Sequence, residues 1–225
     1  MTSTSPRRSS ARGSGRSYGG VPAEVRVAQR RDRFLDAGLD LLGTKGYQAT
    51  SVRAVCREAG LSERYFYESF ANTEALLVGV YQRCTDKMHD EILVAMATGD
   101  RRASTAMEAL EQVVRTTLDA FYASVSDPRV LRVCWLEVLG VSTLVDSTYI
   151  SGIDRFAQLV ATVMAGTFGV GADEQLRLIA TGLVGGVIMT AIRWYLDGQH
   201  EPVSTLVEAN AVLFLGVAHQ LAARA

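Results

Sequence analysis

Residues 50–70 read TSVRAVCREAGLSERYFYESF. This stretch predicts two short helices joined by a tight turn, because Thr50 or Ser51 can cap a first helix and Gly60 can end it in a left-handed conformation. Ser62 then caps a second helix that runs to about residue 69. The second helix is rich in aromatic and polar side chains, as is a helix that enters the major groove of DNA. The stretch therefore predicts a helix-turn-helix.

The two predicted helices each have one apolar face. The first helix and the turn supply Val52, Val55, Ala59 and Leu61 for packing. Phe66 and Phe70 are four residues apart, so they share the buried face of the second helix. The outward side chains of that helix are then Glu63, Arg64, Tyr65, Tyr67 and Glu68.

The outward side chains predict specific contacts with DNA. Arg64 suits bidentate recognition of guanine, Tyr65 suits a thymine methyl group, and Tyr67 suits a phosphate. The helix that begins after Ser51 offers its N-terminal amides as a phosphate cradle, and the helix after Asn72, which we expect Thr73 to cap, offers a second one. The predicted DNA-contacting residues are Thr50, Ser51, Arg53, Ser62, Glu63, Arg64, Tyr65, Tyr67, Glu68 and Thr73.

The charge is distributed unevenly along the 225 residues, although the net formal charge is only -1. Residues 1–70 contain twelve Lys or Arg and seven Asp or Glu, a net charge of +5, whereas residues 71–225 carry a net charge of -6. This pattern predicts a polyanion-binding module attached to a part that does not touch the polyanion. Residues 1–22 are rich in Ser, Arg and Gly and predict a disordered basic arm, which either contacts DNA or only solubilises the chain.

Helical periodicity continues along the whole chain, and no run alternates like a strand. We expect an all-α fold of nine helices, with a helix-turn-helix domain at 23–72 and a larger helical domain at 73–225. The helices outside the motif are expected at about 27–45, 73–97, 104–125, 130–141, 146–168, 173–196 and 203–223.

Neither a metal site nor a membrane span is expected. Cys56, Cys84 and Cys134 each sit in an apolar helical pattern without metal or disulfide spacing, and the three histidines are far apart. No uninterrupted apolar run reaches about 18 residues. A catalytic constellation or a Gly-rich phosphate loop is also not evident. We therefore expect a cytoplasmic protein without a cofactor that is not an enzyme.

The order of these elements resembles the DNA-binding signature of TetR-type (tetracycline-repressor-like) bacterial regulators over about residues 27–82. The positions that carry the resemblance are Thr50, Gly60, Ser62, Tyr67, Phe70, Glu74, Ala75 and Leu76. Departures fall on the base-reading surface: Glu63, Arg64 and Tyr65 replace the Lys, Gly and small residue of the family pattern. Glu68 likewise replaces a His, and Thr73 replaces a Lys. The operator sequence therefore cannot be taken over from the family and has to be measured.

The resemblance implies a C-terminal domain that dimerises and binds a small molecule. The last two helices are expected to form the dimer interface through Leu183, Gly186, Val187, Trp194, Leu206, Leu213, Phe214 and Val217. Gly182, Gly185 and Gly186 weaken a helix and make sense where another helix packs closely. A cavity for a largely apolar ligand is expected from Phe121, Tyr122, Trp135, Leu139, Met164 and Phe168.

The sequence thus favours a ligand-responsive repressor that binds a palindromic operator in double-stranded DNA as a homodimer. Three alternatives remain at this stage. The chain could be an enzyme with a deep polar pocket, an architectural DNA-binding protein that senses nothing, or an activator rather than a repressor.

Overall fold

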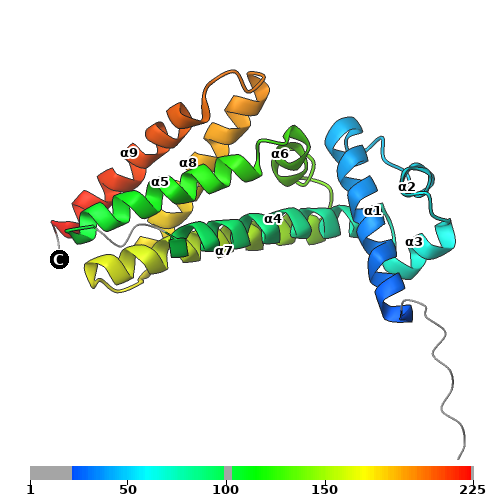
Figure 1. Ribbon diagram of the computed structural model, residues 1–225, viewed down its shortest axis with the longest axis horizontal. Coiled ribbons are helices and arrows are strands. Elements are labelled where there is room, and N and C mark those ends of the chain that lie inside the picture. Colours follow the sequence, from blue (N-terminus) through cyan, green and yellow to red (C-terminus); the bar gives the residue numbers. More distant parts are fainter. Residues whose placement is uncertain (1–21, 99–102, 224–225) are drawn as a thin grey trace, which may run out of the picture.

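The computed structural model describes residues 22–98 and 103–223. Over these ranges the chain forms nine α-helices and no strand, so the all-α prediction is confirmed. Apart from Pro22, the predicted basic arm at 1–22 lies outside the described residues. A small head formed by α1–α3 projects from one end of an elongated body (Figure 1).

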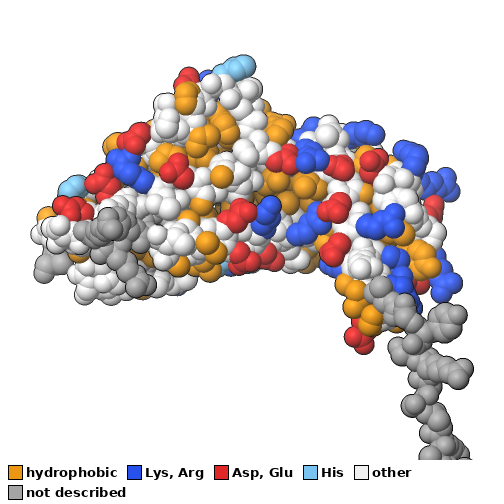
Figure 2. Space-filling model, in the orientation of Figure 1, with side chains coloured by type: hydrophobic (Ala, Val, Ile, Leu, Met, Phe, Trp, Pro, Cys, Tyr) orange, Lys and Arg blue, Asp and Glu red, His pale blue; other side chains and the backbone are white. Residues whose placement is uncertain are grey.

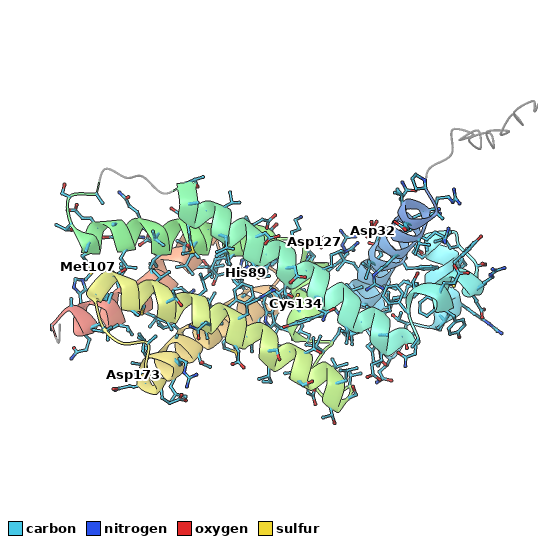
Figure 3. All side chains as sticks on the ribbon, turned by 90° about the horizontal axis from the view of Figure 1, so that it is seen from below. Asp32, His89, Met107, Asp127, Cys134 and Asp173 are labelled. Carbon is cyan, nitrogen blue, oxygen red and sulfur yellow. The ribbon has the colours of Figure 1, made fainter. Side chains whose placement is uncertain are left out.

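The head comprises α1 (Ala23–Lys45), α2 (Val52–Ala59) and α3 (Glu63–Ser69). The body comprises α4 (Thr73–Thr98), α5 (Ala106–Ser124), α6 (Pro128–Trp135), α7 (Thr143–Phe168), α8 (Glu174–Leu196) and α9 (Val203–Ala222). The long helix α4 starts at the head and runs along the body beside α7 (Figures 1 and 3). Because α4 belongs to both parts, it is the main mechanical link between them.

Two glycines allow α1 and α4 to approach each other closely. A Cβ atom added at Gly38 of α1 would lie 2.9 Å from a methyl carbon of Val80. A Cβ atom at Gly79 of α4 would lie 3.0 Å from the Phe70 ring. Both distances are shorter than ordinary van der Waals contacts, so larger residues here would push α4 away from the head.

The helix starts refine the predicted caps. Ser51 caps α2, since its hydroxyl accepts a backbone N–H bond of 3.3 Å, and Gly60 ends α2 in the predicted left-handed conformation, with φ 62°. Ser62 occupies the N-cap position of α3, but its side chain makes no capping hydrogen bond. Asn72, not Thr73, caps α4 through a 2.8 Å bond from a backbone N–H to its side-chain oxygen. Thr73 is the first residue of that helix.

The middle of the body differs most from the predicted boundaries. Helix α6 was expected to reach residue 141 but ends at Trp135. The chain then turns at Gly140, which has φ 78°, and the side chain of Glu137 bonds back to the head. Helix α7 begins at Thr143, three residues before the predicted start, because Ser142 caps it.

Candidate nucleic-acid interface and ligand cavity

Helix α3 is fixed to the head by a buried aromatic cluster. Phe66 is fully buried and meets the Phe34 ring of α1 edge-to-face, with ring centroids 5.4 Å apart. Phe70 is 4% exposed and contacts Phe66 from the next turn, at 5.8 Å. The predicted inward face of α3 is therefore the face that packs, and the opposite side of a seven-residue helix is left for solvent.

The predicted outward residues of α3 are all exposed. Tyr65 is 37% exposed and Tyr67 is 58% exposed, which is unusual for large aromatic side chains without a partner surface. Glu63, Arg64 and Glu68 surround them. Figure 2 shows that Lys and Arg side chains gather at the end of the molecule formed by the head. The surface thus combines exposed aromatic rings with cations, which is the composition of a nucleic-acid interface.

Carboxylates neutralise the cations on this face. Arg64 Nε lies 3.2 Å from Glu68 Oε1, one turn further along α3. Arg53 of α2 lies 3.4 Å from Glu63. Both arginine side chains are more than four-fifths exposed, so these pairs are weak in water and can exchange for phosphate or base contacts.

Two α1 residues that the sequence analysis did not select also belong to this surface. The Arg30 guanidinium stacks over the Tyr65 ring, 4.3 Å from its centroid, and lies 3.5 Å from Glu68. Arg31 stacks on Phe70 at 4.3 Å and donates to the Ser69 carbonyl at 2.9 Å. The sequence shows a run of arginines early in α1, but the position of this run beside α3 depends on tertiary packing.

The remaining predicted DNA contacts lie at helix ends. Ser51 and Arg53 are exposed at the start of α2, and Ser62 is exposed before α3. Thr73 is partly buried in the first turn of α4. Thr50 is different, since it is 7% exposed and its hydroxyl donates to the Gly46 carbonyl at 2.8 Å. Any contact between Thr50 and DNA must therefore involve its backbone.

A polar latch joins α6 to the end of α1. Glu137 accepts a 2.6 Å hydrogen bond from the backbone N–H of Tyr47 and pairs with Arg132 at 2.8 Å. Arg132 in turn donates to the Thr44 carbonyl at 2.9 Å. Glu137 is therefore part of the contact between head and body and does not reach the ligand cavity.

A second contact lies one turn earlier on α6. Arg129 pairs with Asp127 at 2.6 Å and also with Asp40 of α1. Asp127 caps α6, and the Arg129 guanidinium lowers the pKa of its carboxyl group. Asp127 and Asp32 are labelled in Figure 3, on the body and the head respectively. These ion pairs add polar contacts beside the latch.

The body contains an almost entirely apolar cavity of about 110 Å³ between α4, α5, α7 and α8. Of the predicted ligand-contacting residues, Phe121, Trp135 and Met164 line it. Other residues that line the cavity include Tyr81, Thr85, Met88, Met96, Thr117 and Phe156. A single helix pattern could not identify these, because the lining is assembled from helices far apart in the sequence.

The other three predicted ligand contacts lie elsewhere. Tyr122 is fully buried, and its hydroxyl accepts a 2.9 Å bond from Asn210, so it is part of the packed core. Burial raises its pKa to about 12 and keeps it neutral. Leu139 is 55% exposed in the loop after α6, and Phe168 packs at the end of α7 outside the cavity lining.

The outer faces of α8 and α9 are apolar and open. The exposed apolar residues and glycines of α8 are Leu178, Gly182, Gly185, Met189 and Leu196, and those of α9 include Val212, Leu213 and Gly216. A Cβ atom at Gly182, Gly185 or Gly216 would meet nothing within 4 Å in the described protomer. The outer stripe is the name we give to the exposed residues Leu178, Gly182, Gly185, Met189 and Leu196 of α8 together with Val212, Leu213 and Gly216 of α9.

Most residues predicted for the dimer interface lie on the opposite faces. Leu183, Val187, Trp194, Leu206 and Phe214 are each less than a tenth exposed inside the protomer. This corrects their assignment, because a side chain in the core of one protomer is not available to a second. Gly186 and Val217 are partly exposed, and Leu213 is 50% exposed on the outer stripe.

Both helices also have the length and mean hydropathy of a membrane span, which the search for uninterrupted apolar runs did not detect. Only 28% of the most apolar window of α8 and 33% of that of α9 are buried inside the protomer. A large apolar surface is therefore left for a partner.

Comparisons with known proteins agree with this architecture. Residues 34–80, which cover most of α1, all of α2 and α3 and the start of α4, match the model of the bacterial regulatory proteins of the tetR family. The chain is 32% identical over 109 residues to the HTH-type transcriptional regulator AlkX of Mycobacterium tuberculosis. That match spans about half of each chain, 48% of this one and 49% of AlkX.

Longer matches extend the likeness to the body. The HTH-type transcriptional repressor KstR2 of Rhodococcus jostii is 26% identical over 186 residues, 80% of this chain and 86% of its own. The fatty acid degradation regulator FadR from Bacillus halodurans has a similar fold, with a TM-score of 0.68 at 20% identity over 83% of this chain and 95% of its own. A putative transcriptional regulator from Pseudomonas aeruginosa has a TM-score of 0.70 at 20% identity, over 90% and 99%.

The family model covers the head, and the longer alignments also cover the helices of the body. The relatives are named as regulators of transcription and not as enzymes. The head and the helical body behind it both have counterparts there. The head therefore matches the tetR family of bacterial regulatory proteins, and over most of its length the chain is similar to a transcriptional repressor.

Proposed function

We propose that this protein is a cytoplasmic transcriptional repressor that binds a palindromic operator as a homodimer and is released by a small, largely apolar ligand. The observation that carries the proposal is the exposed face of α3, where Arg64, Tyr65 and Tyr67 stand on a rigid, buried Phe66 anchor. A helix of this kind, placed at the end of a head that carries exposed arginines, suits insertion into the major groove.

Selection of operators from random DNA with the purified full-length protein tests the proposal directly. The expected product is an inverted repeat whose half-site centres are one helical turn apart, about 34 Å, or a multiple of that. Enrichment of a single, asymmetric half-site would contradict the dimeric arrangement. No enrichment of any sequence would contradict specific DNA recognition itself.

The outer stripe supports the homodimer. Two-fold symmetric dimers use the same patch of both subunits, and α8 and α9 offer such a patch with small residues at its centre. Gly182 and Gly185 allow the backbone of a partner helix to come close, which offsets their cost within an isolated helix. A palindromic operator requires that this arrangement bring the two heads to the same side of the dimer.

The cavity supports a ligand-responsive protein over an architectural one. Its lining includes no charged side chain among the described residues, so an apolar ligand is favoured. One structural neighbour, FadR from Bacillus subtilis, is described in complex with stearoyl-CoA. A regulator of this fold can therefore bind a molecule that carries an apolar chain, which supports a largely apolar ligand here.

Two elements touch both the cavity and the head and can transmit a signal. Helix α4 contributes Met88 to the cavity and packs on α1 near its other end. Helix α6 contributes Trp135 to the cavity, while Arg132 and Glu137 hold the end of α1. A ligand that enlarges the cavity therefore displaces both elements and changes the spacing of the two heads, which weakens operator binding.

This mechanism is tested by measuring operator affinity and the distance between the heads of a dimer, with and without a ligand. Both quantities should change together. A ligand that binds the body and leaves both unchanged would show that release does not proceed through head spacing. Position of the operator relative to the promoter then separates repression from activation.

A further inference from the structure

The cavity in the body contains a buried hydroxyl group that the protein does not use. Thr117 of α5 lines the cavity, and its Oγ1 atom is buried without a hydrogen-bond partner in the described chain. Elsewhere in the body, helical threonines such as Thr167 and Thr190 donate to the carbonyl four residues earlier, at 2.8 Å. Thr117 makes no such bond, and a buried polar group without a partner requires an explanation.

The other hydroxyl groups of the lining, those of Tyr81 and Thr85, are already occupied. The Tyr81 hydroxyl donates to the Tyr149 carbonyl at 3.3 Å, and the Thr85 hydroxyl donates to the Tyr81 carbonyl at 3.0 Å. Burial also raises the pKa of Tyr81, so it stays neutral. Thr117 is therefore the group in this lining that is best placed to bind a polar atom of a ligand.

The position of Thr117 on α5 directs it to the ligand space. Leu110, Val113, Val114, Leu118 and Phe121 of the same helix also line the cavity, at spacings of three and four residues. Thr117 lies in the middle of this face. A ligand that fills the cavity therefore lies against the face of α5 that carries Thr117.

The lining also excludes a charged ligand group at this depth. An ionised carboxylate placed among apolar side chains would be desolvated without a compensating charge. The nearby cation, Arg155 of α7, already pairs with Asp86 at 2.6 Å. Although Arg155 Nε is buried without a partner, it is not among the residues that line the cavity.

Building on the proposed function, we propose that the effector is an uncharged, mainly hydrocarbon molecule with one oxygen function, an alcohol or a ketone, that is hydrogen-bonded to Thr117. A hydroxyl group both donates and accepts, so it can bind either oxygen function. The rest of the molecule contacts the apolar lining. One directional bond in an apolar site sets the orientation of the ligand and gives specificity.

The size of the cavity limits the first ligands to test. At about 110 Å³ it is close to an engineered apolar cavity of about 150 Å³ that binds benzene, and it is smaller than typical ligand pockets. Met88, Met96 and Met164 line it, and methionine side chains adapt easily to a new shape. Chains of about eight carbon atoms are therefore suitable probes, since they require some expansion of the cavity.

The experiment is calorimetric titration of the full-length protein with 1-octanol, 2-octanone, octane and octanoate. We expect the alcohol and the ketone to bind more tightly than octane, and octanoate to bind most weakly. Thr117→Val should weaken the alcohol and the ketone about five- to tenfold, to the affinity of octane, because one neutral hydrogen bond is lost. Thr117→Ser keeps the hydroxyl and should keep the preference, and it also serves if the valine variant folds poorly.

Thr167→Val is the matched control, because it removes a threonine hydroxyl from a helix of the body outside the cavity lining. It should leave the order of the four affinities unchanged. Equal loss in the two valine variants, or equal binding of octane and octanol by the unaltered protein, would overturn the proposal. Tightest binding of octanoate, abolished by Arg155→Gln, would overturn it in favour of an anionic ligand.

Operator binding is measured on the same samples, so that failure of the proposed ligand class can be distinguished from failure of the proposed DNA-binding function. Failure of all four probes to bind, with operator binding intact, would overturn the proposed ligand class and leave the DNA-binding function standing. Loss of specific DNA binding in the unaltered protein would instead contradict the proposed function. If Thr117 binds only water, Thr117→Val should leave the affinities for the alcohol and the ketone unchanged. This outcome would also contradict the proposal.

Discussion

At the scale of single residues, Arg64 and Arg53 are expected to do different work on DNA. Arg64→Ala removes a candidate bidentate contact with guanine, which should cost about 1–3 kcal/mol on the selected operator and little on random DNA. Arg53→Ala removes a phosphate contact, so affinity should fall on both DNAs and the salt dependence should decrease by about one counterion. Fluorescence anisotropy at several salt concentrations measures both effects. If Arg64→Ala lowers the affinity for both DNAs equally, Arg64 contacts the DNA backbone and not a base.

Glu68 is expected to restrain the cations beside it. It contacts both Arg64 at 3.2 Å and Arg30 at 3.5 Å, and its charge opposes that of the phosphates. Glu68→Gln should therefore tighten binding to random duplex DNA severalfold, by up to about 1 kcal/mol. Glu58→Gln removes another exposed carboxylate of the head and is the control for charge alone. A gain of the same size in both variants would mean that release of the arginines contributes nothing.

At the scale of elements, the contact between α6 and α1 should be a measurable source of stability. Glu137 accepts from a backbone N–H and pairs with Arg132, and its side chain is only 16% exposed. Glu137→Gln should lower the free energy of unfolding by about 1–3 kcal/mol in urea. Asp197→Asn breaks a surface pair with Arg193 instead and should cost about 0.5 kcal/mol or less. Similar costs for both variants would show that the latch does not stabilise the head.

Some elements could be predicted from the sequence because the information is local. The turn at Gly60 and the shared face of Phe66 and Phe70 follow from spacing alone. The prediction of Thr73 as the cap of α4 was wrong, because Asn72 beside it is an equally good capping residue and spacing does not separate the two. The end of α6 at Trp135 was also hidden, since the apolar pattern continues and the contact of Glu137 with α1 is tertiary.

The candidate DNA-binding surface and the cavity could likewise be predicted only where local spacing determines them. The outward face of α3 needs only helical periodicity, whereas the stacking of Arg30 on Tyr65 needs the docking of α1 on α3. In the body, core residues and cavity-lining residues lie on the buried faces of the same helices, so periodicity does not tell core from cavity. Tyr122 and Trp135 illustrate this, because both are buried aromatic residues but only Trp135 lines the cavity.

At the scale of the whole molecule, Gly185 separates a monomer from a dimer. In an isolated protomer, Gly185→Leu adds a side chain into open space and improves helix propensity by about 0.5–1 kcal/mol. In a dimer held together by the outer stripe, the same side chain would separate two closely packed helices. We therefore expect a folded monomer by sedimentation, with helix content intact and operator affinity strongly reduced, because a single head contacts only one half-site.

Gly166→Leu is the matched control for this prediction. Gly166 is exposed in the helix α7, and a Cβ atom there also meets nothing within 4 Å in the described protomer. It lies outside the outer stripe, so the leucine variant should remain dimeric and bind the operator normally. If Gly185→Leu also stays dimeric with normal operator binding, the protomers associate through another surface. The apolar outer faces of α8 and α9 would then need a different partner, because exposed stripes of this size are otherwise a liability for solubility.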